Sequence, residues 1–137
     1  MNMKRFLVAQ ERDYEIALSE IRSGRKQSHW MWYVFPQIQG LGFSSMAQFY
    51  AIKDREEAVA YLQHPILGKR LVEITEALID LKENNATDVM GYPDDLKLKS
   101  SMTLFYMVSE MEVFKKVLDL FFEGDMDTKT LEILKLY

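Results

Sequence analysis

The sequence predicts an all-α fold: one compact domain of about seven or eight helices, packed as an irregular or orthogonal bundle or a short right-handed superhelix, with no sheet. Apolar residues recur at intervals of three and four along most of the chain, which is the period of an amphipathic helix. Serine, aspartate and glycine residues punctuate these runs at cap positions, and no stretch alternates apolar and polar residues over the length of a strand. The length of 137 residues suits a single domain spanning residues 1–137.

The first two helices are marked by turn residues at both ends. Apolar residues from Phe6 to Ile21 share one helical face, and Gly24 is placed to end that helix in the left-handed conformation. Ser28 then predicts the cap of a short second helix over residues 29–35. Pro36 ends this helix because proline disfavours helical geometry in the residue before it.

The middle of the chain holds a glycine loop and the clearest helix start. Residues 37–43 form the loop, after which Ser44 predicts the cap of a third helix. Asp54 and Glu57 form an acidic variant of the capping box, which opens a fourth helix. The four-three spacing of leucines and isoleucines over residues 65–81 predicts the long central helix.

The last third of the chain carries the same kinds of boundary residue. We expect a helix end at Asn84–Asn85, a loop at residues 91–93, a helix start at Asp94 or Asp95, a capping box of Ser109 and Glu112, a helix stop at Gly124 and a cap at Asp127.

Composition excludes several classes of function. The net charge is −4 and the positive charges are scattered, which argues against a protein that binds duplex nucleic acid or a membrane surface. The absence of cysteine removes disulfides, thiolate nucleophiles and cysteine-ligated metals, and fits a reducing compartment. The amino terminus has too short an apolar run for a signal peptide, so we expect a soluble cytoplasmic protein.

Two runs of sequence are distinctive: SHWMWYVFPQ at Ser28–Gln37 and SSMTLF at Ser100–Phe105. Shorter phrases accompany them over nearly the whole chain, including Ala9-Gln10, Gly40-Leu-Gly42, Tyr50-Ala51-Ile52, His64-Pro65 and Lys97-Leu98. Together they resemble a small bacterial family of unknown function (domain of unknown function 1810), often labelled calpastatin. The resemblance implies an all-α single domain and brings no established activity, substrate or catalytic residue. Calpastatin itself is a disordered inhibitor, whereas this chain has the caps and apolar stripes of a packed domain.

The segment Lys26–Ser45 contains the first group of candidate site residues. With Ser28 as a cap, His29 occupies the first turn of a helix, where unpaired N–H groups and the helix dipole favour an anion. Lys26 precedes this turn and adds a positive charge. A structural histidine is an equally good interpretation of His29.

The aromatic residues of this segment also admit two interpretations. We expect Trp30 in the core, with Trp32 or Tyr33 stacking on a ligand ring and Gln37 binding the edge of that ring. Alternatively, all these aromatics are structural, as aromatic stripes usually are.

Two further clusters complete the candidate site. Gly40, Gly42 and Ser44 form a glycine loop that leads into a helix and suits either anion binding or, more commonly, a tight turn. Lys97 and Ser101 are four residues apart and share a helical face, close to Asp95. The simpler interpretation is that the serine hydroxyl binds a backbone carbonyl.

These residues support a hypothesis of function and a rival. The hypothesis is a pocket for an anionic small molecule, such as a nucleotide or sugar-phosphate derivative. Any hydrolysis or group transfer would use His29 and Asp95 as acid–base groups, without cofactor or metal. It predicts one concave pocket lined by Lys26, His29, Gln37, Lys97 and Ser101. The rival is a non-catalytic protein-interaction module with a structural aromatic core and an exposed apolar patch. The sequence leaves open the ligand, any reaction and the oligomeric state.

Overall fold

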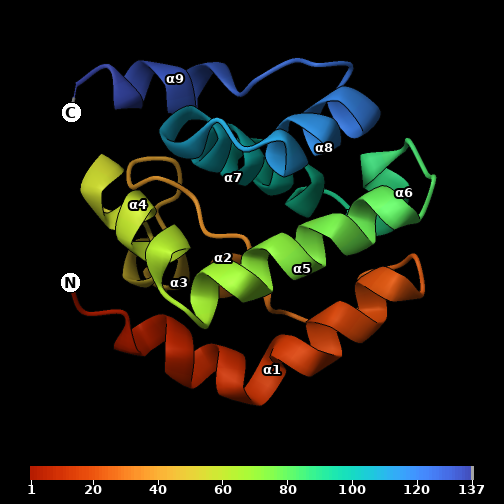
Figure 1. Cartoon of the computed structure of the whole chain (residues 1–137), viewed down its shortest axis with the longest axis horizontal. Coiled ribbons are helices and arrows are strands. Elements are labelled where there is room, and N and C mark those ends of the chain that lie inside the picture. Colours follow the sequence, from red (N-terminus) through yellow and green to blue (C-terminus); the bar gives the residue numbers. More distant parts are fainter. Residues whose placement is uncertain (137) are drawn as a thin grey trace.

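The computed structural model describes residues 1–136, which form nine α-helices and no β-strand (Figure 1). The prediction of an all-α fold without a sheet is confirmed. A single isolated bridge, in parallel orientation, joins Ile38 and Ile52 within the described residues. The helices are α1 (Lys4–Arg22), α2 (Met31–Val34), α3 (Ser45–Phe49), α4 (Arg55–Gln63), α5 (Leu67–Asp80), α6 (Ala86–Met90), α7 (Asp94–Ser109), α8 (Glu112–Phe122) and α9 (Thr128–Leu134).

Helix α5 runs through the middle of the molecule, with α1 below it and α7, α8 and α9 above it in Figure 1. It packs against α1, α4 and α8, while α7 packs against α4, α6, α8 and α9. The side chains of Phe6, Leu71, Leu98, Phe105 and Phe114 are fully or almost fully buried between these helices. The predicted central helix is therefore central in space as well as in sequence. No helix in residues 1–136 is both long and apolar enough to cross a membrane.

Most of the predicted boundary residues act as expected. The side chains of Ser44, Asp54 and Asp127 each accept a hydrogen bond from the backbone N–H three residues later, at the starts of α3, α4 and α9. Gly24 and Gly124 have φ of +88° and +80° just after α1 and α8. Such left-handed residues end a helix by turning the chain away, and glycine adopts them without steric cost.

Three boundary predictions are wrong. Helix α2 begins at Met31, not after a Ser28 cap, because the backbone N–H and the hydroxyl of Ser28 both donate to the carboxylate of Glu20. Asn85, expected only to end a helix, caps the unexpected short helix α6 by accepting from the Asp88 N–H. The proposed capping box of Ser109 and Glu112 does not form: α7 continues through Ser109, and α8 starts after Met111 without a side-chain cap.

Candidate functional site

A cleft of about 520 Å³ separates the segment around the glycine loop from the start of α7 and α9. This volume lies within the usual range for small-molecule sites, roughly 300–1,000 Å³. Its walls contain many of the residues that the sequence nominated, drawn from both clusters. The cleft is lined by Trp32, Gln37, Gly40, Leu41, Gly42, Phe43, Ser44, Ala47, Pro93, Leu96, Lys97, Ser100, Asp127 and Lys129.

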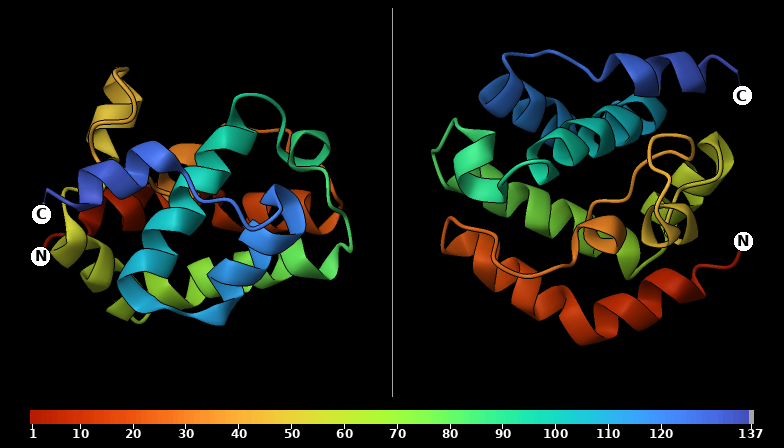
Figure 2. Two further views of the ribbon diagram at one scale, coloured as in Figure 1. Left: turned by 90° about the horizontal axis from the view of Figure 1, so that it is seen from above. Right: turned by 180° about the vertical axis from the view of Figure 1, so that it is seen from behind.

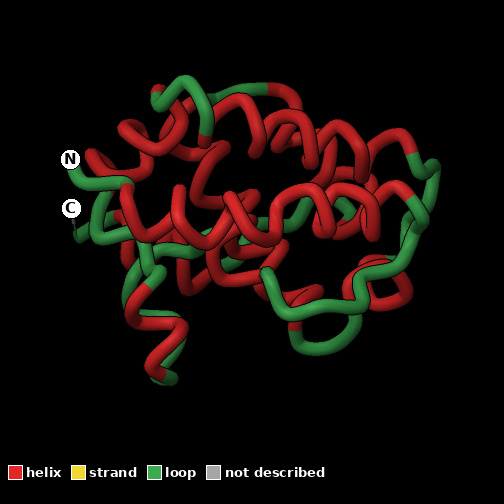
Figure 3. Tube along the Cα trace, turned by 90° about the horizontal axis from the view of Figure 1, so that it is seen from below, coloured by secondary structure: helices red, strands yellow, loops and turns green. Residues whose placement is uncertain are grey.

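One wall is a projecting segment, residues 39–51, which we call the flap. Its base is closed at the Ile38–Ile52 bridge, where the Gln39 N–H donates to the Ile52 carbonyl at 2.7 Å and the Ile52 N–H donates to the Gln37 carbonyl at 2.8 Å. Its helix α3 has no buried residue. The flap stands out from the body in the left view of Figure 2 and again from below in Figure 3.

The glycines of the flap are explained by a tight turn. Gly40 has a φ of +105°, and a Cβ on Gly42 would lie only 2.6 Å from the Cβ of Ala47. Both positions therefore require glycine for the turn itself, whatever the cleft binds. Ser44 follows the turn and uses its hydroxyl oxygen to accept from the Ala47 N–H at 3.1 Å.

The opposite wall is organised by Asp94, at the first position of α7. Its carboxylate lies 2.8 Å from the Lys26 ammonium and 3.4 Å from the Lys97 ammonium. Each lysine also lies over a tryptophan ring, Lys26 at 4.9 Å from the Trp30 centroid and Lys97 at 4.7 Å from the Trp32 centroid. The two polar clusters of the sequence thus meet in space, joined by Asp94, which the sequence marks only as a helix start.

The charges around the cleft sum in favour of an anion. Lys26 is almost fully buried and takes the shorter contact to Asp94, so Lys97 has only the longer contact to the same carboxylate. Lys129 is exposed and makes no ion pair with any residue of the described chain. The carboxylate of Asp127 is engaged in capping α9. Two ammonium groups are therefore available to a ligand.

Glu20 fixes the loop that carries Lys26. Its carboxylate accepts from the N–H groups of Gln27 and Ser28, from the Ser28 hydroxyl and from the Trp30 indole N–H. Partial burial alone would raise the pKa of Glu20, but these hydrogen bonds outweigh burial and bring its pKa down to about 2. This role of Glu20 is not visible in the sequence, because Glu20 occupies an ordinary polar position of α1.

Several predicted site residues lie away from the cleft. Tyr33 is buried in the core, and its hydroxyl donates to the Asp13 carboxylate and contacts the His29 carbonyl. Burial, followed by the bond to Asp13, raises the pKa of Tyr33 to about 12. The side chain of His29 is exposed, and Ser28 is bound to Glu20. None of these residues lines the cleft.

The second cluster is divided in the same way. Lys97 lines the cleft, whereas Asp95 and Ser101 do not. Asp95 is buried and accepts from the Thr87 hydroxyl at 2.6 Å and from the Leu96 N–H at 2.9 Å. Ser101 is fully buried, and its hydroxyl has no hydrogen-bond partner in the described structure. Of the five residues expected to line one pocket, only Gln37 and Lys97 do so. Lys26 does not line the cleft, but it pairs with Asp94, which also contacts Lys97.

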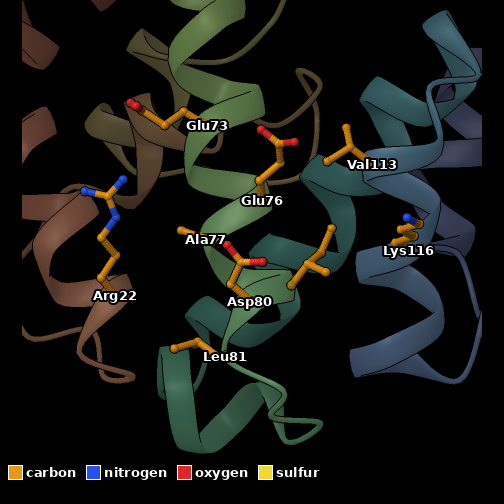
Figure 4. A pocket seen from close by; sticks show the side chains of 9 residues that line it. Arg22, Glu73, Glu76, Ala77, Asp80, Leu81, Val113 and Lys116 are labelled. Atoms are coloured by element: carbon orange, nitrogen blue, oxygen red, sulfur yellow. The ribbon is translucent and has the colours of Figure 1, made fainter.

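A second large groove has the opposite character. It has a volume of about 570 Å³ and lies between α1, α5 and α8. Figure 4 shows Glu73, Glu76 and Asp80 projecting from α5 between Arg22 on α1 and Lys116 on α8. Three carboxylates against two cations disfavour an anion. Among residues 1–136, no three or more carboxylate or histidine side chains are placed so that they could hold a metal ion.

The likeness to known proteins extends over almost the whole chain. A family model described as "Protein of unknown function (DUF1810)" matches residues 1–134. The chain belongs to this family. Its fold is similar to the crystal structure of the conserved hypothetical protein Rv1873 from Mycobacterium tuberculosis, with a TM-score of 0.96 and 44% sequence identity. The similarity covers 98% of this chain and 96% of that chain. A comparison with curated proteins found no match.

The flap belongs to a stretch of the sequence that lacks charged residues. Residues 27–52 contain no aspartate, glutamate, lysine or arginine, in a chain of which 28% is charged. A buried helix explains the uncharged part up to Phe35, but it does not explain the exposed Phe43, Met46 and Phe49. The uncharged stretch therefore extends beyond the buried helix into the exposed flap.

Proposed function

We propose that the cleft between the flap and α7 binds an anionic small molecule, such as a nucleotide or sugar-phosphate derivative. The observation that carries the proposal is the placement of Lys97. Its ammonium group lies in the wall of the cleft, steadied by Trp32, beside a carboxylate that already has a shorter contact with Lys26. A ligand anion competes only with the 3.4 Å contact to Asp94.

The other polar residues of the cleft complete an anion site. Lys129 supplies a second ammonium group from the start of α9, on the same side as Lys97. The Ser44 hydroxyl accepts from the backbone and keeps its own proton to donate to a ligand oxygen. Gln37 adds an amide group that can donate or accept. The proposal is for binding, since His29 and Asp95, the residues nominated for proton transfer, lie outside the cleft.

The test compares ligand affinity in the wild type, in Lys97→Ala and in a matched control. Lys99→Ala removes a lysine from the same helix that does not line the cleft. Isothermal titration with AMP, UMP, ribose 5-phosphate and inorganic pyrophosphate is expected to show binding of at least one probe to the wild type. A hydrogen bond to a charged group contributes about 1.5–3 kcal/mol. Lys97→Ala should therefore weaken the affinity for that probe about tenfold or more.

The control and the negative results separate the interpretations. Lys99→Ala should bind the same probe with an affinity within about twofold of the wild type, because Lys99 does not line the cleft. The proposal is wrong if no probe binds the wild type, or if Lys97→Ala and Lys99→Ala bind alike.

The rival function, a protein-interaction module, has one observation in its favour. A groove of about 460 Å³ lies at the base of the flap on the side of α1, where Val8 and Phe49 are each 59% exposed. Pull-down from a lysate would address it. A partner that is lost with Val8→Lys and retained with Lys97→Ala would favour the rival over the ligand site.

A further inference from the structure

The two walls of the cleft differ in chemistry. Lys97 and Lys129 lie on the wall formed by α7 and α9, whereas the flap contributes Leu41, Phe43 and Ala47 and carries no charged residue. Phe43 is 84% exposed, more than any other large hydrophobic side chain in the described chain. A ligand that fits both walls has an anionic part on one side and an apolar surface on the other.

The flap is held at and near its base, where Leu41 also packs against the core. Tyr50 packs against Tyr33 and Phe6, with ring centroids 5.0 and 6.1 Å apart, and the Ile38–Ile52 bridge closes the base. Beyond this base, α3 buries none of its residues. Segments with few buried contacts move at low free-energy cost, so the flap is able to shift toward α7 while its base stays fixed.

We infer that the flap closes over a bound ligand and that Phe43 covers a planar ring of that ligand. The inference rests on the proposed anion site and names its ligand class: compounds that join a phosphate or similar anion to a planar ring, as nucleotides do. The anion lies against Lys97 and Lys129, and the ring lies under Phe43. Stacking on an exposed aromatic removes apolar surface of both partners from water and is tolerant of the ring's identity.

The chain offers a matched control for Phe43. Phe49 lies on the same flap and is also exposed, at 59%, but it lines the groove on the side of α1 and not the cleft. Both phenylalanines are exposed, and Phe49 makes an edge contact with the Tyr50 ring at 4.8 Å between centroids. Phe43→Ala and Phe49→Ala should both stay close to the thermal unfolding midpoint of the wild type. Differences in binding then report on the ligand and not on folding.

The experiment measures affinity for AMP and UMP, which have a ring, and for ribose 5-phosphate, which has none. We expect Phe43→Ala to weaken nucleotide binding about tenfold, from the known effect of removing one aromatic stacking partner, and to leave ribose 5-phosphate within about twofold. Phe49→Ala should change neither. Backbone amides of residues 40–49 should exchange more slowly with solvent when AMP is bound to the wild type or to Phe49→Ala.

Failure of the inference is distinct from failure of the proposed function. If the nucleotides bind in a Lys97-dependent way and Phe43→Ala binds them as the wild type does, the cover by Phe43 is wrong and the anion site stands. If Phe43→Ala weakens nucleotides and ribose 5-phosphate equally, or if AMP leaves exchange in the flap unchanged, the inference is also wrong. If no probe binds the wild type, the proposed function and the inference fall together.

Discussion

Glu20 offers the sharpest test of how the loop before α2 is held, because four hydrogen bonds converge on one carboxylate. Three of them reach the same oxygen, Oε1: the N–H groups of Gln27 and Ser28 at 2.8 and 2.9 Å and the Trp30 indole N–H at 2.9 Å. Trp30 is only 1% exposed, so in the folded protein its indole N–H depends on the Glu20 carboxylate for a hydrogen-bond partner. The backbone groups lie nearer the surface, where water can replace the carboxylate.

These contacts set the expected cost of Glu20→Ala. Leaving the buried Trp30 N–H without a partner costs about 1–3 kcal/mol. The bonds from Gln27 and Ser28 would each contribute about 1.5–3 kcal/mol, but water replaces part of this when the carboxylate is removed. We therefore expect Glu20→Ala to lower the free energy of unfolding by about 3 kcal/mol. Glu20→Gln keeps an oxygen in place of Oε1 but loses the charge and puts an amide NH2 in place of Oε2, so the Ser28 hydroxyl can no longer donate there and must turn to accept. Its cost should be about 1 kcal/mol.

The assay is urea unfolding followed by tryptophan fluorescence, at pH 7 and in a pH series. The pKa of Glu20 is about 2 in the folded protein, below its ordinary value of 4.5, so folding favours the ionised form. This contribution to stability is complete above the ordinary value and is lost as the pH falls toward the folded pKa. Glu20→Gln has no carboxyl group, so its deficit against the wild type should shrink over that range.

Two results would refute this reasoning. One is a urea midpoint for Glu20→Ala equal to that of the wild type at pH 7. The other is a difference between the wild type and Glu20→Gln that stays constant as the pH falls through the acid range.

Two substitutions test packing elsewhere, alongside the binding variants of Lys97 and Phe43. Gly68→Ala should destabilise the protein by about 3 kcal/mol or more in urea unfolding, because the new Cβ would lie 1.9 Å from the Leu62 carbonyl oxygen. An increase in stability, which alanine usually gives in a helix, would contradict that close approach. Ser101→Ala should raise the free energy of unfolding by about 1 kcal/mol, since it removes a buried hydroxyl that has no partner. A loss of stability there would show that the Ser101 hydroxyl is bonded in solution.

Local signals in the sequence determined most of the helices of this protein. Caps and stops act within three or four residues of their own position, so Asp54, Asp127 and Gly124 could be interpreted without knowledge of the rest of the chain. The apolar period likewise predicted the central helix α5. One error arose where a residue outside that range took part: the Ser28 hydroxyl binds Glu20 and so does not cap α2.

The candidate site depended on tertiary structure to a greater degree. The sequence nominated Trp32, Gln37 and Lys97 individually, but only the packing of α7 beside the segment before α2 brings them to one cleft. Asp94 pairs with Lys97 at i,i+3 spacing on α7, but no spacing in the sequence relates either residue to Lys26. Residue types and periodicity report on contacts within a few positions, whereas charge pairing across the chain is fixed when helices pack. For that reason the helices were predictable from the sequence, and the cleft was not.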